Sequence, residues 1–282
     1  MPMANLTVRP TTPADRELVS ALLTTANLRH VHLDWVPALE LVEDPLFMIA
    51  LHNDLPRACL AAPPDPLPIA WIRVFAAAPE DPHGPLWQTL WAGLHERAKT
   101  LEIKTIYSLA LQPWFEPLLS GAGFSMANEV VFYEWRGSAG VLARNERISI
   151  RRMRPDDLLH VEQVDHSAFA PAWQNSIRTL TTASKLSTYA TVCEVEGDLV
   201  GYQISTASAL GAHLARLAVL PEFQRQGVGR ELVVDMLRHI SRRGFDRVTV
   251  NTQADNLSSQ YLYNSLGFEP TGQHYPMYAY TF

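Results

Sequence analysis

The sequence predicts two copies of one α/β domain in tandem, and three observations support this fold class. The chain has 282 residues, which is long for one small domain and suited to two. Strand-like and helix-like segments follow one another in the same order in both halves. A polar stretch without periodicity at 137–146 separates the halves, so we expect domains at 1–136 and 147–282 joined by a linker.

The first half alternates short apolar runs with turn residues. A helix is expected after Thr12, a suitable N-cap, with Pro13 in its first turn. A second helix is expected around 86–94, where apolar residues recur at helical spacing. Strands are expected at 6–9, 46–51, 59–61, 69–75, 103–109 and 130–135.

The second half repeats the first at a nearly constant offset of about 142 to 144 residues, beginning with a strand at 147–151. An offset that persists over many elements indicates an internal duplication. The matched pairs are Arg9 and Arg151, Pro13 and Pro155, Asp15 and Asp157, Arg73 and Arg216, Pro79 and Pro221, Glu80 and Glu222, Thr105 and Thr249, Gly123 and Gly267, and Phe124 and Phe268.

A glycine-rich turn follows a short buried strand in the second half. The strand runs through Leu217 and Val219, and residues 224–229 then turn into a helix with a regular apolar face. The first N–H groups of a helix lack intrahelical acceptors and carry partial positive charge, so this turn favours a phosphate. Gly227 and Gly229 let the backbone approach that phosphate closely.

Two motifs in the second half resemble those of one enzyme family. The pattern Gln224-x-x-Gly227-x-Gly229 resembles the acetyl-CoA-binding motif of the GCN5-related N-acetyltransferases, the GNAT superfamily. The pattern Asn256-x-x-Ser259-x-x-Leu262-Tyr263-x-x-Leu266-Gly267-Phe268 resembles the second motif of that family. Tandem arrangements occur within it. The resemblance implies that each domain is a mixed, mostly antiparallel twisted sheet flanked by helices. It also implies an acetyl-CoA-dependent N-acetyltransferase in which a primary amine attacks directly.

The resemblance implies that acetyl-CoA binds in the second half. The strands at 217–219 and 248–251 are expected to part, and the pantetheine amides would complete the interrupted ladder in the gap. A backbone N–H of Val219 or Leu220 would stabilise the oxyanion. The residues expected to hold the cofactor are Leu217, Ala218, Val219, Gln224, Arg225, Gln226, Gly227, Val228, Gly229, Arg230, Asn251, Asn256 and Ser259.

Two residues are candidates for the proton transfers. Tyr263 lies where the family often places the acid that protonates the leaving thiolate, although packing alone would also explain a tyrosine there. His213 is the candidate base, directly or through a water, and an exposed histidine at the start of a strand is the alternative. Glu194 and His274 are further candidates for the base. An amine that arrives neutral would need no strong base.

The acceptor pocket is expected between the first helix pair of the second half and a C-terminal hairpin. The segment Phe169-x-x-x-Trp173 resembles one in the enzymes that acetylate ribosomal-protein N-termini. Tyr189, His274 and Tyr275 would add polar and aromatic contacts, although aromatic residues near turns equally often serve packing. Nothing in the sequence identifies the acceptor.

The first half departs from the family pattern where cofactor would bind. Its loop has Asp81, which would place a carboxylate at the phosphate position, and Pro85, which has no N–H to donate. It has one glycine in place of two, and Leu119 stands where the second half has Tyr263. We therefore expect the first domain to be structural, and a second working site is the alternative.

Composition narrows the remaining possibilities. The net charge of −6 and the lack of a basic run argue against a nucleic-acid partner, and no metal site is predicted. Cys59 and Cys193 are lone cysteines, and no signal peptide or long apolar span is recognisable, so a cytoplasmic monomer or homodimer away from membranes is expected. The alternative function is a non-catalytic module that binds CoA or a partner.

Overall fold

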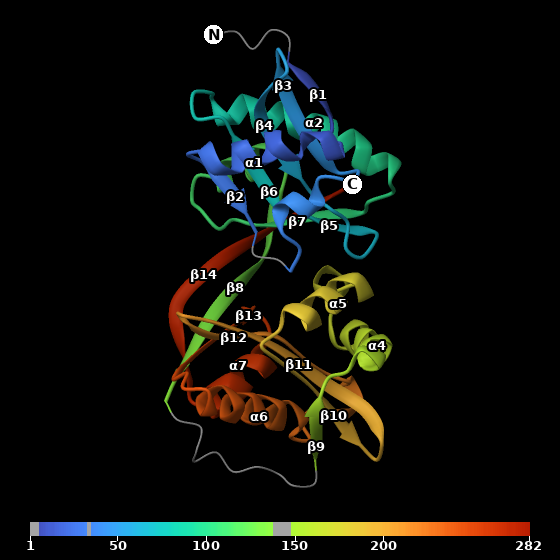
Figure 1. Cartoon of the computed structure of the whole chain (residues 1–282), viewed down its shortest axis with the longest axis vertical. Coiled ribbons are helices and arrows are strands. Elements are labelled where there is room, and N and C mark those ends of the chain that lie inside the picture. The colour runs from blue at the N-terminus through green and yellow to red at the C-terminus, as the bar shows by residue number, and fades with distance from the viewer. Residues whose placement is uncertain (1–5, 33–34, 138–147) are drawn as a thin grey trace. The chain divides into compact units, whose positions relative to one another are not determined.

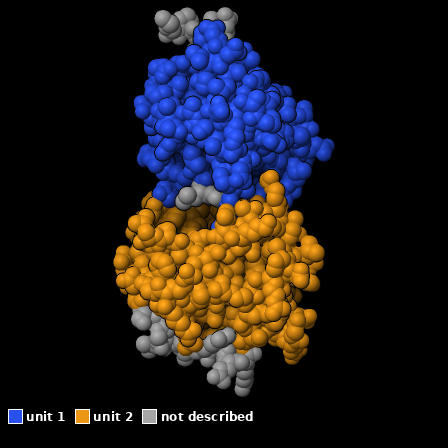
Figure 2. All heavy atoms as spheres, viewed as in Figure 1, with its two compact units in different colours: residues 1–127, 275–282 blue, residues 128–274 orange. Residues whose placement is uncertain are grey.

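The chain folds into two compact units (Figures 1 and 2). The computed structural model describes residues 6–32, 35–137 and 148–282. Unit 1 comprises residues 1–127 and 275–282, and unit 2 comprises residues 128–274. The predicted linker at 137–146 lies outside the described residues, apart from Gly137. None of the described helices is long and apolar enough to cross a lipid bilayer.

The units differ from the predicted consecutive domains because two strands change unit along their length. Strand β8 (Ser125–Arg136) begins in unit 1 and ends in unit 2, where its second part pairs antiparallel with β13 (Arg247–Gln253). Strand β14 (Phe268–Thr281) begins in unit 2 and ends in unit 1, where it pairs antiparallel with β7 (Thr105–Leu109). The expected C-terminal hairpin is wrong, since β14 is one long strand.

Unit 1 contains a largely antiparallel sheet in the order β1-β3-β4-β6-β2, beside a short parallel pair of β5 and β7. Helix α1 packs Val19 and Leu22 on one face of this sheet, and α2 packs Leu86, Trp87 and Leu90 on the other. Its further elements are β1 (Thr7–Pro10), α1 (Arg16–Thr25), β2 (Arg29–Val31), β3 (Phe47–His52), β4 (Leu55–Ala61), β5 (Ile69–Trp71), β6 (Val74–Ala77), α2 (His83–Thr100) and α3 (Glu116–Gly121).

The strand expected at 69–75 is broken in two. Its first part, β5, pairs with β7, and the chain then shifts at Ile72 and Arg73 to form β6. One edge of β6 pairs with β4, and the other edge pairs antiparallel with β2, a strand that the sequence analysis missed. The backbone N–H of His32 extends this pairing to the carbonyl of Arg73 at 2.8 Å.

Unit 2 contains a sheet in the order β9-β10-β11-β12-β13-β8, in which only β12 and β13 are parallel. Helix α6 covers one face with apolar residues, and α4 and α5 lie against β11 and β12 on the other face (Figure 1). The predicted mixed, mostly antiparallel fold is therefore confirmed. Its further elements are β9 (Ser149–Arg152), α4 (Leu158–Ala168), α5 (Ile177–Leu186), β10 (Tyr189–Val195), β11 (Asp198–Ser208), β12 (Gly211–Val219), α6 (Val228–Arg242) and α7 (Leu257–Ser265).

The duplication is visible in an ion pair that both units share. Arg9 Nη1 lies 2.7 Å from Asp15 Oδ2 in unit 1, and Arg151 Nη1 lies 2.7 Å from Asp157 Oδ2 in unit 2. Both carboxylates also accept a backbone N–H three residues earlier, and both arginine bonds lower the carboxyl pKa, to about 2 for Asp15. Each pair ties the first strand of its unit to the start of the first helix.

Candidate functional site

The parallel strands β12 and β13 separate after a short paired stretch. Their register covers Ala212–Leu214 against Val248–Val250 and then ends. An extra residue bulges β12 between Leu214 and Arg216, which helps to turn its C-terminal part. The last residues of β12 therefore continue toward α6 with only β11 paired beside them.

The hydrogen-bond alternation along β12 determines which backbone groups face the side of β13. Leu220 donates its N–H to the carbonyl of Val200 at 2.9 Å. Because bonded and non-bonded pairs alternate in an antiparallel ladder, Ala218 also bonds toward β11, whereas Leu217 and Val219 turn their N–H groups to the opposite side. Leu220 is thus not available as an oxyanion donor, and that alternative is wrong. The N–H groups of Leu217 and Val219, two residues apart on the strand, can instead donate hydrogen bonds to an extended ligand chain.

The loop between β12 and α6 has the geometry of an anion site. Arg225 and Gly227 have left-handed backbone angles, with φ of 59° and 91°. Left-handed residues next to a helix start turn successive N–H groups toward one point, and a non-glycine in that region is a feature typical of functional loops. The first intrahelical bond of α6 runs from Glu231 N to Gly227 O at 3.0 Å, so the N–H groups of Val228 and Gly229 precede it.

Three of the predicted polar side chains brace this loop. Gln224 donates its Nε2 to the carbonyl of Val219 at 3.0 Å, and Gln226 donates to the carbonyl of Glu222 at 2.7 Å. Arg230 forms an ion pair with the buried Glu231 at 2.8 Å. Because these three side chains are engaged in bonds within the loop and its flanks, the backbone N–H groups are the groups best suited to bind a phosphate.

Helix α7 adjoins the loop at Gly229. A Cβ on Gly229 would lie 3.5 Å from Leu262 of α7 and 3.7 Å from Val219 of β12, so the three elements meet there. Asn256 caps α7, since its side chain accepts the N–H of Ser259 at 3.1 Å, and its amide lies 3.4 Å from Gln253 Oε1. Binding of the cofactor arm by Asn256 and Ser259 stays a prediction beside this capping role.

Tyr263 lies on the α6 face of the sheet. Its ring packs against Tyr133 and Phe268, and only 4 % of the residue is exposed. Burial raises the pKa of its phenol, and a hydrogen bond with Ser259 opposes that shift only in part. The phenol therefore carries its proton at neutral pH, as a proton donor must.

His213 lies on the opposite face, in the middle of the three rows where β12 and β13 pair. Its Nδ1 is 2.9 Å from the hydroxyl of Thr249, directly across from it on β13. Burial lowers the pKa of the imidazole, while hydrogen bonds with Thr249 and Asn251 partly offset this effect. His213 is thus neutral at pH 7. Asn251 lies on β13 just beyond the rows that pair with β12. Its side-chain amide can form hydrogen bonds but cannot act as a base.

The other two candidate bases are placed differently. Glu194 forms an ion pair with Arg151, 2.6 Å from its Nη2, as part of the network that also holds Asp157. His274 is exposed on β14, with its Nε2 3.8 Å from Glu129. The Glu194 carboxylate is occupied by the Arg151 guanidinium, whereas His213 lies in the rows where β12 and β13 pair, so the geometry favours His213 over Glu194. Among the described residues, no three His, Cys, Asp or Glu side chains are grouped to hold a metal.

The predicted acceptor residues are only partly brought together. Phe169 and Trp173 lie in the segment between α4 and α5, and both contact Arg216 of β12. Tyr189 lies elsewhere: it stacks on His239 of α6 at 3.8 Å and donates to Asp235, on the other face of the sheet. Its expected place in the pocket is therefore wrong, because its position in β10 points it toward α6. Tyr275 belongs to unit 1.

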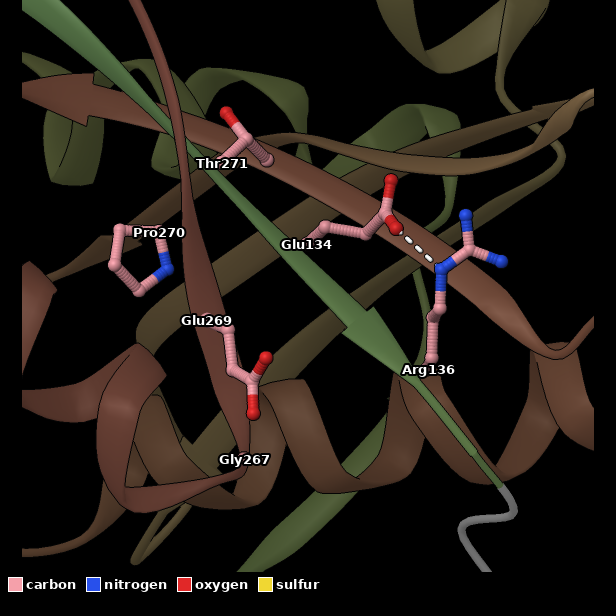
Figure 3. A pocket seen from close by; sticks show the side chains of 6 residues that line it. All are labelled: Glu134, Arg136, Gly267, Glu269, Pro270 and Thr271. Carbon is pink, nitrogen blue, oxygen red and sulfur yellow. Dashed lines mark hydrogen bonds and ion pairs between the residues drawn. The ribbon is translucent and has the colours of Figure 1, made fainter.

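Unit 2 also carries a polar depression, which none of these acceptor residues lines (Figure 3). Its lining consists of Glu134, Arg136, Gly267, Glu269, Pro270 and Thr271. Glu134 is partly buried, which would raise its pKa, but ion pairs with Arg247 and Arg136 bring about a net lowering. None of the predicted cofactor residues lines this depression, and its Glu134 carboxylate is already paired with two arginines.

The sequence analysis missed one buried cluster beside the site. Asp165 of α4 bonds to both Tyr202 of β11 and Arg216 of β12. The signal was present, since Arg216 is the one charge in the otherwise apolar stretch 214–219. Its partner, however, is 51 residues away and could not be identified from spacing.

Comparison with protein families gives one match in unit 2. Residues 155–268 match the model of the acetyltransferase (GNAT) family. The match begins at the start of the first helix of unit 2 and ends at Phe268, so it includes the loop, His213 and Tyr263.

Curated relatives match part of the chain. A Bacillus subtilis protein provisionally named a ribosomal protein bS18-alanine N-acetyltransferase is 24% identical over 126 residues, 45% of this chain and 83% of that protein. The Escherichia coli K12 ribosomal protein bS18-alanine N-acetyltransferase is 33% identical over 72 residues, 26% of this chain and 49% of that protein. The chain thus spans about half the length of the latter.

Solved structures resemble the whole chain in fold. A tandem GNAT protein from the clavulanic acid biosynthesis pathway has a TM-score of 0.68 at 16% identity, covering 98% of both chains. A GCN5-related N-acetyltransferase from Sphaerobacter thermophilus has a TM-score of 0.64 at 13% identity, covering 98% of this chain and 95% of that one. At these identities the likeness concerns the fold.

Gly229 provides a test of the loop. Gly229→Pro removes one N–H at the second position of α6, where a proline backbone is tolerated. We expect it to abolish thermal stabilisation by acetyl-CoA, a loss of about 2.7 kcal/mol at a ligand concentration of 100 Kd. Gly229→Ala is the matched control, because it keeps the N–H and its Cβ makes ordinary contacts. Equal stabilisation of Gly229→Pro and the native protein would contradict the assignment.

Proposed function

We propose that this chain, whose residues 155–268 match the model of the GNAT family of acetyltransferases, is an N-acetyltransferase of that type, and that unit 2 transfers the acetyl group of acetyl-CoA to a primary amine. The observation that carries the proposal is the edge of β12 beyond Leu214, beside which no described strand pairs and which leads directly into the amide-rich start of α6. A diphosphate fits the loop, and an extended chain with amides of its own fits the edge.

The groups that would hold acetyl-CoA are mostly backbone groups. The N–H groups of Val228 and Gly229, at the positive end of α6, would bind the pyrophosphate. The backbone of Leu217 and Val219 would bond to the pantetheine amides, in place of the strand that β13 does not provide there. The N–H of Leu217 or Val219 would then stabilise the oxyanion.

The reaction is a direct transfer. The neutral acceptor amine attacks the thioester carbonyl, a C–N bond forms, and collapse of the tetrahedral intermediate breaks the C–S bond. The amine proton passes to His213, and the leaving thiolate takes a proton from Tyr263. Exchange with water restores both side chains. In the net reaction the amine gains the acetyl group and loses one proton, and CoA is released as the thiol. His213 and Tyr263 lie on opposite faces of the sheet, which suits a base beside the amine and an acid beside the sulfur.

We propose that unit 1 is structural. Its α2 begins beside Asp81, whose carboxylate is 2.5 Å from Arg57, and Pro85 removes an N–H from the first turn. More decisively, β2 covers the edge of β6 that corresponds to the open edge of β12 in unit 2. The backbone groups that would bind pantetheine are thus already bonded to the chain itself.

The names of two relatives suggest the class of acceptor that we propose for this chain. The Bacillus and Escherichia relatives are named for the alanine of ribosomal protein bS18. A peptide N-terminus is a primary amine with an ordinary pKa near 8, so a substantial fraction is neutral at physiological pH. We therefore propose a peptide N-terminal amine as the acceptor and a small amine as the alternative.

A thiol-release assay tests the function. Purified chain is incubated with acetyl-CoA and a hexapeptide that begins with alanine, and free CoA is measured. The expected result is thiol release that requires the free N-terminus and is lost with the same peptide blocked at that amine. Thermal stabilisation by acetyl-CoA without thiol release from any amine would favour the non-catalytic module.

His213→Gln tests the base through pH dependence. A base acts only when neutral, and burial lowers the pKa of His213, so native kcat should fall as pH drops through a value below 6.5. We expect the variant to lose this limb and about 100-fold in kcat. The peptide is kept at a saturating concentration, so that the acidic limb of kcat is not confused with protonation of the peptide amine, whose pKa is near 8. Glu194→Gln is the control and should keep the limb; a limb that persists in His213→Gln would rule out His213.

Tyr263→Phe tests the acid. The ring contacts with Tyr133 and Phe268 remain, so cofactor affinity should change less than about twofold while kcat falls about 100-fold. Tyr133→Phe is the matched control, because it removes a buried phenol that bonds Gln260 and leaves Tyr263 in place. Unchanged kcat in Tyr263→Phe would show that the thiolate obtains its proton elsewhere.

A further inference from the structure

A single buried carboxylate ties together three elements of unit 2. Asp165 of α4 is fully buried and accepts from Arg216 Nε at 2.8 Å, Arg216 Nη2 at 2.9 Å, the phenol of Tyr202, and the N–H of Asn175 at 2.9 Å. A carboxylate has about four acceptor sites, so this one is saturated. A buried charge is stable only when paired and bonded in this way, which makes the cluster rigid.

Arg216 extends the cluster to the predicted acceptor segment. Its guanidinium carbon lies 3.7 Å from the centre of the Phe169 ring, and its Nη2 donates to the carbonyl of Trp173 at 2.5 Å. The planar guanidinium uses one edge for the carboxylate and its face for the ring, a combination that a lysine ammonium cannot reproduce. Arg216 also directly precedes Leu217, whose N–H faces the open edge of β12.

The rest of the segment 169–177 is bonded along its length. Gln174 Nε2 donates to the carbonyls of His166 and Phe169, each at 3.0 Å. Glu162 Oε1 accepts the N–H of Ile177 at 2.7 Å, where α5 begins. These bonds hold the segment to α4, whereas the bonds of Arg216 link it to β12. The segment is therefore preformed, and the Arg216 side chain links it to the reacting strand.

Unit 1 gives an internal comparison. Its counterpart of Arg216 is Arg73, whose Nη1 lies 2.7 Å from His32 Nδ1, just after β2. In both units this arginine thus meets the chain that follows the first helix. In unit 1 that chain enters the sheet as β2, whereas in unit 2 it stays outside the sheet edge as the segment 169–177.

We propose that Arg216 is a positioning residue: it fixes the segment carrying Phe169 and Trp173 in register with the Leu217 amide, so that an acceptor amine meets the thioester. The proposal rests on the acetyltransferase function proposed above. It assigns Arg216 no contact with either substrate, and it predicts that weakening this anchor impairs use of the acceptor and spares the cofactor.

The test compares Arg216→Lys with native protein in two measurements. Steady-state kinetics with acetyl-CoA and the alanine hexapeptide should show KM for the peptide raised at least about tenfold, as expected for one charge-assisted hydrogen bond, with KM for acetyl-CoA unchanged. Hydrogen exchange should be faster at 169–177 and unchanged in α6. Arg151→Lys is the matched control, because Arg151 also bridges carboxylates in unit 2 but does not contact this segment.

Each outcome decides the proposal. Equal changes in both KM values, or exchange at 169–177 like that of native protein, would overturn it. A merely structural role would speed exchange throughout β11 and β12 and would also overturn it. If native protein does not acetylate the hexapeptide, the proposed acceptor class fails, and exchange alone then judges whether Arg216 anchors the segment. If Arg216→Lys does not fold, the uncharged pair Asp165→Asn with Arg216→Gln replaces it in the same measurements.

Discussion

The structure depends on how the backbone at one strand edge is satisfied. In unit 2, β12 pairs with β13 over three rows and then continues without it, so the N–H groups of Leu217 and Val219 face away from β11, toward the side that β13 has left. Buried backbone groups are nearly always bonded in proteins. Unit 1 satisfies the corresponding edge of β6 with its own β2. On our account, unit 2 leaves the edge to the amides of a ligand, and this difference separates the two copies most clearly.

The remaining features of unit 2 are arranged around that edge. The loop braced by Gln224 brings the first N–H groups of α6 to its end. Tyr263 lies on the α6 face, and His213 and the Arg216 cluster lie on the other face. A thioester held along the edge would thus have a proton donor on one side and an acceptor amine on the other. The sheet thus separates the apolar face covered by α6 from the face that carries His213 and the Arg216 cluster.

Much of this was predictable from sequence because it depends on local patterns. The glycine turn and the apolar stripe of α6 are short-range signals, and the repeat offset can be read directly along the sequence. The fold that they predicted is confirmed, and residues 155–268 match the model of the predicted family. The features that could not be predicted depend on partners distant in sequence. Strand β2 has only three residues and no alternation, and its pairing with β6 is set by tertiary structure. Tyr189 was misplaced because sequence does not reveal which face the first residue of a strand occupies. The change of unit along β8 and β14 leaves no local signal at all.

The most direct test is a crystal structure of the full chain with acetyl-CoA. The account predicts one bound molecule per chain, with its diphosphate on the N–H groups of Val228 and Gly229 and its pantetheine arm along Leu217 and Val219. Density beside β6 in unit 1, with β2 displaced, or a molecule bound away from the β12 edge, would contradict it.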